Sequence, residues 1–104
     1  SGCACEIDLV NVPVWPKVVE YAEAMVRPGR TADVVAYLDR FVDWGDAGFT
    51  WKGILADPQT SGGLMMAVAP EKAEELLAAL ESRGEEAAVV GRMVDGEAGT
   101  IRIV

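Results

Sequence analysis

The stretch GLMMAVAPEKAEELLAALESRGEEAAVVGRMV, residues 63–94, decides the fold class because its hydrophobic period changes twice. Gly63–Ala69 is apolar at nearly every position, which predicts a strand buried on both faces. From Pro70 the apolar residues recur at three- and four-residue spacing, which indicates a helix that ends at Gly84. Apolar residues resume at Ala87–Val94 and predict a second strand. The stretch therefore predicts a right-handed strand–helix–strand crossover with its helix on one face of a sheet.

Shorter patterns on either side of this stretch predict three further strands. Cys3–Leu9 alternates apolar and polar residues, as a strand with one buried face does. Phe49–Leu55 is a short apolar run that predicts another strand. Thr100–Val104 alternates again, after the tight turn expected at Asp95–Gly99. The C-terminal half is therefore predicted to run β-α-β-β.

Two helices are expected in the N-terminal half. Pro16 suits the first turn of one helix, and Arg27–Arg30, which contains a proline and a glycine, ends it. Thr31 is expected to cap the next helix, which Gly45 and Gly48 interrupt. The expected buried stripes are Val18, Val19, Ala22, Met25 and Val26 in the first helix and Val34, Val35, Leu38, Phe41 and Val42 in the second. With these helices opposite the C-terminal helix, the fold class is α/β (α+β), a three-layer α/β/α arrangement around a mixed sheet.

Length and charge exclude several classes of partner. The chain has 104 residues, which fits one domain with its own core. Its 17 acidic and nine basic residues give a formal net charge of -8, which argues against nucleic acid and anionic membranes as partners. Because no apolar run reaches the roughly 18 residues of a membrane helix, we expect a soluble, cytoplasmic protein. Because a predicted strand begins almost at residue 1, we also expect a fragment of a longer protein.

The cysteine and acidic side chains near the N-terminus predict neither a catalytic nor a metal site. Cys3 and Cys5 lie two residues apart on a strand, about 7 Å from each other, which is too far for an unstrained disulfide. The chain has no histidine, so it lacks a zinc ligand set and any nucleophile–histidine pair. Glu6 and Asp8 are interpreted as solvated acids. We therefore predict no catalytic residue and no metal site in this chain.

The segment DPQTSGG, Asp57–Gly63, is the strongest candidate for a functional loop. Pro58 fixes its own φ angle, and the two glycines allow another chain or a ligand to approach closely. Consecutive N–H groups at Ser61–Gly63 suit an anion, whereas the Asp57 carboxylate suits a hard cation such as Mg²⁺. Known phosphate loops lead into a helix, but this loop leads into a predicted strand. On residue chemistry alone, two interpretations of this segment remain open. It is either a turn whose side chains hydrogen-bond to its own backbone, or a loop that contacts a ligand or another domain.

Three segments together resemble one protein family. DPQTSGGLMMAVAPEKAEELLAAL, Asp57–Leu80, resembles the C-terminal domain of selenide, water dikinase (selenophosphate synthetase), in the aminoimidazole ribonucleotide synthetase-like superfamily. EIDL, Glu6–Leu9, and PGRTADVVAY, Pro28–Tyr37, resemble two further segments of that family in the same order. The resemblance spans nearly the whole chain. It implies an α/β/α domain of partly ferredoxin-like topology, as the periodicity does.

The resemblance also implies an activity for a larger protein. Members of the family use Mg²⁺ and ATP to convert selenide and water into selenophosphate, AMP and phosphate. Their catalytic cysteine or selenocysteine, lysine and metal-binding aspartates belong to segments that have no counterpart in this chain. Residues 1–104 are thus expected to be a single domain that lacks its N-terminal ATP-binding partner domain and is inactive alone. The complete enzyme is expected to be a homodimer.

The resemblance implies site residues only at positions of this chain that match the family's motif. The expected ligand-binding or domain-interface residues are Asp57, Gln59, Thr60, Ser61, Gly62 and Gly63, with Gly29 and Thr31 as secondary candidates. Arg30 and Val34 stand where the family has glycine and asparagine, so a polar side chain and a flexible point are missing there. Two alternative functions remain: a domain of another ATP-dependent enzyme of the superfamily, and a non-catalytic acidic interaction module.

Overall fold

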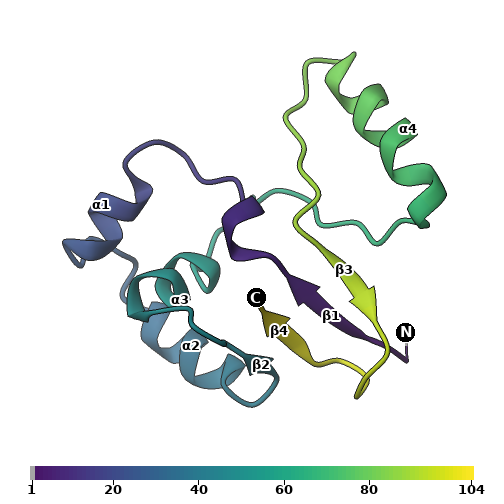
Figure 1. Ribbon diagram of the computed structural model, residues 1–104. Coiled ribbons are helices and arrows are strands. Elements are labelled where there is room, and N and C mark those ends of the chain that lie inside the picture. Colours follow the sequence, from purple (N-terminus) through teal and green to yellow (C-terminus); the bar gives the residue numbers. More distant parts are fainter. Residues whose placement is uncertain (1) are drawn as a thin grey trace.

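The computed structural model describes residues 2–104 and contains a four-stranded sheet and four α-helices (Figure 1). The strands are β1 (Ala4–Ile7), β2 (Val42–Asp43), β3 (Gly91–Val94) and β4 (Ile101–Ile103). The helices are α1 (Val18–Glu23), α2 (Thr31–Leu38), α3 (Phe49–Leu55) and α4 (Pro70–Glu81), and a 3₁₀ helix, η1 (Leu9–Asn11), follows β1. The expected α/β class with a mixed sheet is confirmed. None of the described helices is both long and apolar enough to cross a membrane.

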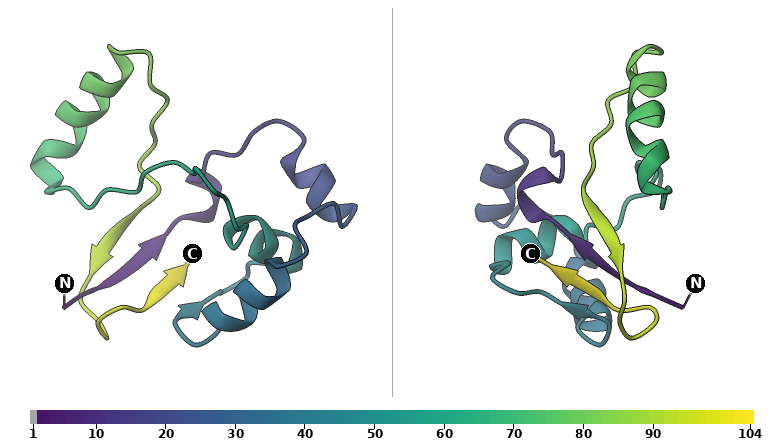
Figure 2. Two further views of the ribbon diagram at one scale, coloured as in Figure 1. Left: turned by 180° about the vertical axis from the view of Figure 1, so that it is seen from behind. Right: turned by 45° about the vertical axis from the view of Figure 1, so that its right-hand side comes forward.

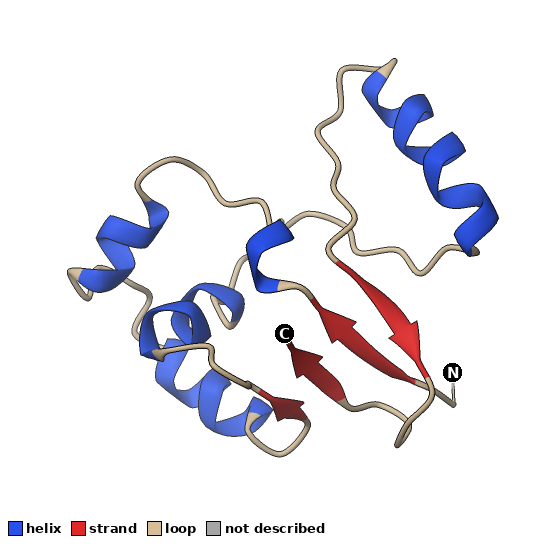
Figure 3. Cartoon of the chain, in the orientation of Figure 1, coloured by secondary structure: helices blue, strands red, loops and turns tan. Residues whose placement is uncertain are grey.

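The sheet has the strand order β2-β4-β1-β3. β1 is parallel to β4 and antiparallel to β3, and β4 is also parallel to β2. β3 and β4 follow each other in the chain but lie on opposite sides of β1, so the turn between them passes the start of β1 (Figure 3). β1 and β3 approach closely at Gly91, where a Cβ atom would overlap the carbonyl oxygen of Glu6.

One face of the sheet carries the core. Cys5 pairs with Ile101 and Ile7 pairs with Ile103, so these side chains share a face with Val42 of β2. Helices α2 and α3 pack against the β2–β4 side of this face (Figure 2). The buried cluster consists of Val42, Trp44, Ala47 and Ile103, with Ile7, Leu9, Val35, Leu38, Trp51, Leu55 and Ile101 partly buried around it.

Two elements near this core differ from the sequence prediction. Phe49–Leu55 is the helix α3 and not a strand, since Trp51 and Leu55 are four residues apart and both contact the core on one helical face. The second expected helix ends at Leu38, and Val42 lies in β2 instead of completing the helical stripe. Thr31 is the first residue of α2, whose cap is Arg30.

The segment between the loop and β3 differs more strongly. Gly63–Ala69 forms no strand, and its residues are exposed, with Leu64 89% accessible. Helix α4 keeps its expected start at Pro70, but it has no buried residue and lies away from the sheet (Figures 1 and 2). β3 begins only at Gly91 because β1, its partner, ends at Ile7. The third layer that was expected from α4 is therefore not formed.

Candidate functional site

The loop Asp57–Gly63 leaves the body of the protein at the end of α3. Ala56, which caps α3, is 3% exposed and anchors this end of the loop. The backbone N–H of Asp57 donates to the carbonyl of Ile54 at 3.3 Å. The Asp57 carboxylate accepts a hydrogen bond of 3.0 Å from the side-chain amide of Gln59. The first part of the loop is thus fixed by backbone and side-chain contacts, and Asp57 is half-buried.

The rest of the loop turns its polar groups to solvent. Pro58 to Gly63 are all exposed, and the hydroxyls of Thr60 and Ser61 make no hydrogen bond within residues 2–104. Neither Gly62 nor Gly63 has a positive φ. An anion-binding nest alternates right- and left-handed residues, so the nest expected at Ser61–Gly63 is not formed. Donors and acceptors are nevertheless available here to a ligand or another domain.

The secondary candidates lie on the other side of α3. Gly53 is buried in α3, and a Cβ built on it would lie 3.1 Å from Nη1 of Arg27 and 3.8 Å from Cγ2 of Thr31. Thr31 is 1% exposed, and its hydroxyl has no hydrogen-bond partner among the described residues. Gly29 is exposed. Of these two candidates, only Gly29 is open to solvent, whereas Thr31 packs against the helix that leads into the loop.

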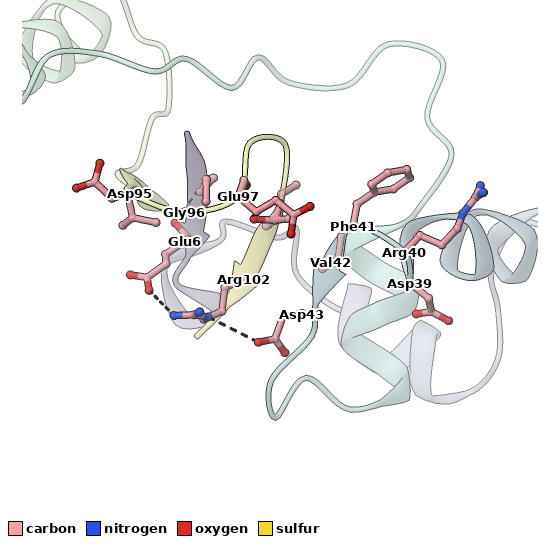
Figure 4. Close-up of a pocket in the computed structure, with 15 residues that line it drawn as sticks. Glu6, Asp39, Arg40, Phe41, Val42, Asp43, Asp95, Gly96, Glu97 and Arg102 are labelled. Atoms are coloured by element: carbon pink, nitrogen blue, oxygen red, sulfur yellow. Dashed lines mark hydrogen bonds and ion pairs between the residues drawn. The ribbon is translucent and has the colours of Figure 1, made fainter. Parts of the chain in front are cut away.

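A row of charges across the open face of the sheet was not predicted from the sequence. This charge ladder consists of Asp43, Arg102, Glu6 and Arg92, one residue from each strand in register (Figure 4 shows the first three). Arg92 Nη2 and Nε donate to Glu6 Oε2 at 2.6 and 2.9 Å. Arg102 Nη1 donates to Glu6 Oε1 at 3.2 Å, and its Nε lies 3.6 Å from Asp43 Oδ2. The carboxylate at the centre of the charge ladder belongs to Glu6. The side chain of Glu6 is only 13% exposed and is bonded to arginine, so Glu6 is not the solvated acid that was expected.

Asp8, the other acid of the expected pair, has a local role. Its Oδ1 accepts from the N–H of Val10 at 3.3 Å and its Oδ2 accepts from the amide of Asn11 at 2.8 Å. Asp8 therefore caps η1 and takes no part in the charge ladder.

A shallow concavity of about 470 Å³ lies beside the charge ladder (Figure 4). Its rim combines Glu6 and Arg102 with acidic side chains from two turns, Asp39 before β2 and Asp95 and Glu97 after β3. The loop Asp57–Gly63 does not contribute to its lining. The structure therefore keeps the candidate loop and this acidic concavity apart.

The carboxylates in the described part of the chain do not assemble a metal centre. Within residues 2–104, no three cysteine, aspartate or glutamate side chains come together around a point where an ion would sit. In the loop, Asp57 supplies a single carboxylate, which is already bonded to Gln59. Mg²⁺ needs several oxygen ligands in near-octahedral geometry. The residues present therefore do not fit a Mg²⁺ site of their own.

Comparison with known proteins gives the loop a context. The family model described as AIR synthase related protein, C-terminal domain, matches residues 1–104. A selenide, water dikinase of Pelobacter propionicus is 44% identical over 97 residues, which cover 91% of this chain and 28% of that protein. Proteins of the same name from Carboxydothermus hydrogenoformans and Pseudomonas putida are 41% and 31% identical over 97 and 105 residues.

This chain spans less than a third of the length of the curated relatives that it matches, 28% or 30% of each of these three. The match lies in their C-terminal part, and the relatives are enzymes. The family model, in contrast, matches every residue from 1 to 104. The chain therefore belongs to the family of AIR synthase related proteins, C-terminal domain.

Proposed function

We propose that this chain is the C-terminal domain of a selenophosphate synthetase, a two-domain enzyme that converts ATP, selenide and water into selenophosphate, AMP and phosphate. The proposal is supported by relatives that bear the name selenide, water dikinase and are 31–44% identical over almost the whole chain. It is carried by one structural observation. The loop Asp57–Gly63 begins on a buried anchor and then exposes two hydroxyls and two glycines that the fold itself does not use.

The loop forms one wall of the substrate site, at the cleft between this domain and an N-terminal ATP-binding domain. Thr60 and Ser61 can donate hydrogen bonds to phosphoryl oxygens, and the glycines let those oxygens come close to the backbone. The side-chain amide of Gln59 donates a hydrogen bond to the carboxylate of Asp57, and this contact positions the start of the loop. Mg²⁺ and ATP are bound mainly by the N-terminal domain, since residues 2–104 do not assemble a cation site. The complete enzyme is a cytoplasmic homodimer in this proposal.

Loop variants of the complete enzyme test the proposal. Asp57→Ala and Thr60→Ala are each expected to lower turnover by about tenfold or more, because Thr60→Ala removes a donor to a phosphoryl oxygen and Asp57→Ala removes the carboxylate that positions the start of the loop. The melting temperature should change by no more than about 3 °C, because both side chains bond to nothing in the core. Turnover per folded molecule is measured as AMP formed from ATP and selenide, and stability by thermal unfolding.

Asp46→Ala is the matched control, because Asp46 is an exposed carboxylate on the turn before α3. It should leave turnover unchanged. A structural loop would show the opposite pattern, with a lower melting temperature and full activity per folded molecule. Formation of AMP by the purified 104-residue chain alone would contradict the division of labour between the two domains.

A further inference from the structure

Three sulfur-bearing side chains share one face of the sheet. Cys5 lies in β1, Cys3 lies just before this strand, and Met93 lies in β3. Cys5 pairs with Met93 in the antiparallel register of the two strands, and paired residues point to the same face. We name Cys3, Cys5 and Met93 the sulfur group. It lies on the face opposite the charge ladder, and neither the ladder nor the candidate loop uses it.

The hydrogen-bond pattern brings Cys5 and Met93 close together. The N–H of Asp8 donates to the carbonyl of Val90 at 2.8 Å, so these two residues form a hydrogen-bonded pair of the β1–β3 ladder. Bonded and non-bonded pairs alternate along an antiparallel ladder, which makes Cys5–Met93 a non-bonded pair. The N–H of Cys5 agrees, because it donates to Thr100 on the β4 side at 3.0 Å. The Cα atoms of such a pair lie about 4.5 Å apart, with their side chains in contact range.

Cys3 continues the same face of β1. The carbonyl of Cys3 accepts from the N–H of Gly99 at 3.2 Å, and the N–H of Cys5 donates to the neighbouring Thr100. Backbone groups and side chains both alternate along an extended strand, so the side chains of Cys3 and Cys5 point the same way, about 7 Å apart. A disulfide needs sulfur atoms about 2 Å apart, whereas a metal ion with bonds of about 2.3 Å holds two of them about 4 Å apart. The spacing therefore suits an ion between the sulfur atoms better than a direct bond.

The sulfur group is within reach of solvent. Helices α2 and α3 cover the β2–β4 side of this face, and the core cluster includes neither Cys5 nor Met93. Both cysteines are half-buried, and Met93 is 47% exposed. The group lies where the start of β1 meets the end of β3, at the margin of the molecule (Figure 1). The Cys5 thiol donates a long bond of 3.7 Å to the carbonyl of Glu6, which a bound ion would replace at little cost.

We propose that Cys3, Cys5 and Met93 form a binding site for a soft monovalent metal ion, Cu(I), held by two thiolates and one thioether. Soft sulfur ligands select Cu(I), whereas Mg²⁺ and Ca²⁺ select oxygen. Structural zinc needs four ligands, but the chain has no histidine, and no third cysteine, aspartate or glutamate joins the two cysteines within residues 2–104. Cu(I) is stable with two or three sulfur ligands, which is the number present.

The charges of this binding step balance without an oxidant or a reductant. Each thiol loses its proton to solvent as its sulfur atom bonds to the ion, so one Cu⁺ and two thiols give a complex of net charge -1 and two protons. The thioether of Met93 donates a lone pair and loses no proton. Copper remains Cu(I) throughout. The formal net charge of -8 on the chain raises the local concentration of cations.

This site differs from the expectation of no metal site in the chain. That expectation weighed zinc and Mg²⁺, which need more ligands or harder ones than the sulfur group supplies. Met93 lies far from Cys5 in the sequence, and only the pairing of β3 with β1 brings the third sulfur atom to the two cysteines. The proposal does not rest on the selenophosphate synthetase function, and its experiments use neither ATP nor selenide.

Titration of the 104-residue chain with Cu(I) tests the stoichiometry. Ascorbate under nitrogen keeps the copper reduced, and a coloured Cu(I) chelator competes for it. Native mass spectrometry should find one copper ion on a monomeric chain, and weakly buffered solution at pH 6 should gain two protons per ion bound. One ion shared by two chains, or the release of one proton or none, would overturn the proposal.

Conservative variants test each ligand. Cys3→Ser and Cys5→Ser should each lower the affinity for Cu(I) by about 100-fold or more, and Met93→Leu by about tenfold, since it spares both thiolates. Met66→Leu is the matched control, because Met66 is a 52% exposed methionine outside the sheet, and it should leave the affinity unchanged. Circular dichroism checks that each variant stays folded. Equal affinities in the four variants and the unchanged chain would overturn the site.

X-ray absorption at the copper edge counts the ligands without depending on how the cysteine variants fold. The unchanged chain should show three sulfur neighbours around copper, and Met93→Leu should show two. Two sulfur neighbours in both proteins would overturn the role of Met93, and nitrogen or oxygen neighbours alone would overturn the sulfur site itself.

Discussion

The core cluster around β2, β4, α2 and α3 and the segment 63–90 contain the same kinds of apolar residue but use them differently. In the core, Val42, Trp44 and Ile103 converge from two distant parts of the chain and are at least 91% buried. In the segment 63–90, Leu64 and Met66 are 89% and 52% exposed although the sequence around them, residues 63–69, is more apolar. The difference shows that burial depends on an available partner surface as well as on hydrophobicity. α2 and α3 fill such a surface on β2 and β4, whereas the edge of β3 is vacant.

The largest expected effect separates the two regions directly. Ile103→Ala removes a 4% exposed side chain from the core cluster and should lower the free energy of unfolding by about 3 kcal/mol. Leu64→Ala removes an 89% exposed side chain and should change it by no more than about 0.5 kcal/mol. Urea unfolding followed by circular dichroism measures both. A loss of about 2 kcal/mol for Leu64→Ala would erase the contrast and show that the side chain of Leu64 is buried in solution.

A smaller effect is expected from the glycine that joins β1 and β3. A Cβ on Gly91 would overlap the backbone of Glu6, and backbone cannot turn aside as a side chain can. Gly91→Ala is therefore expected to lower the free energy of unfolding by about 2 kcal/mol. Gly29→Ala is the control, since no atom lies within 4 Å of a Cβ there. If both variants unfold at the same urea concentration, the close pairing of β1 and β3 does not persist in solution.

The sequence predicted elements well where a pattern is long or a stop residue is strong. α4 begins at Pro70 as expected, and β1 and β4 lie within their predicted ranges. α3 was missed because seven apolar-rich residues suit a strand as well as a helix, and a glycine at position 53 weakens the helical pattern. That glycine is explained only by the tertiary structure, in which Arg27 and Thr31 pack where its side chain would be.

The candidate site was predictable only in its local part. The Asp57–Gln59 contact and the exposure of Thr60 follow from neighbours in the chain. The charge ladder joins Glu6 to residues 86 and 96 positions away, and its register depends on how four strands pair. The pattern of residues within a single strand does not reveal how the four strands pair. Glu6 and Asp8 were grouped by their spacing in a strand, but the strand ends at Ile7, so only Glu6 faces the ladder.

The smallest expected effect concerns the charge ladder, which lies on the face of the sheet opposite the core. Glu6→Gln keeps the shape of the side chain but weakens the bonds from Arg92 and Arg102, so it should lower the free energy of unfolding by about 1 kcal/mol. The exposed pair Arg30–Asp33, at 3.3 Å, provides the control, since Asp33→Asn should cost no more than about 0.3 kcal/mol.

Salt tests whether the charge ladder is open to water, in the same Glu6→Gln variant. The 62–76% exposed arginines are screened by solvent ions, so most of the effect should disappear in 1 M NaCl if the ladder stays open to water. A cost that persists in 1 M NaCl would contradict this exposure and show that the ladder is shielded from solvent ions in solution.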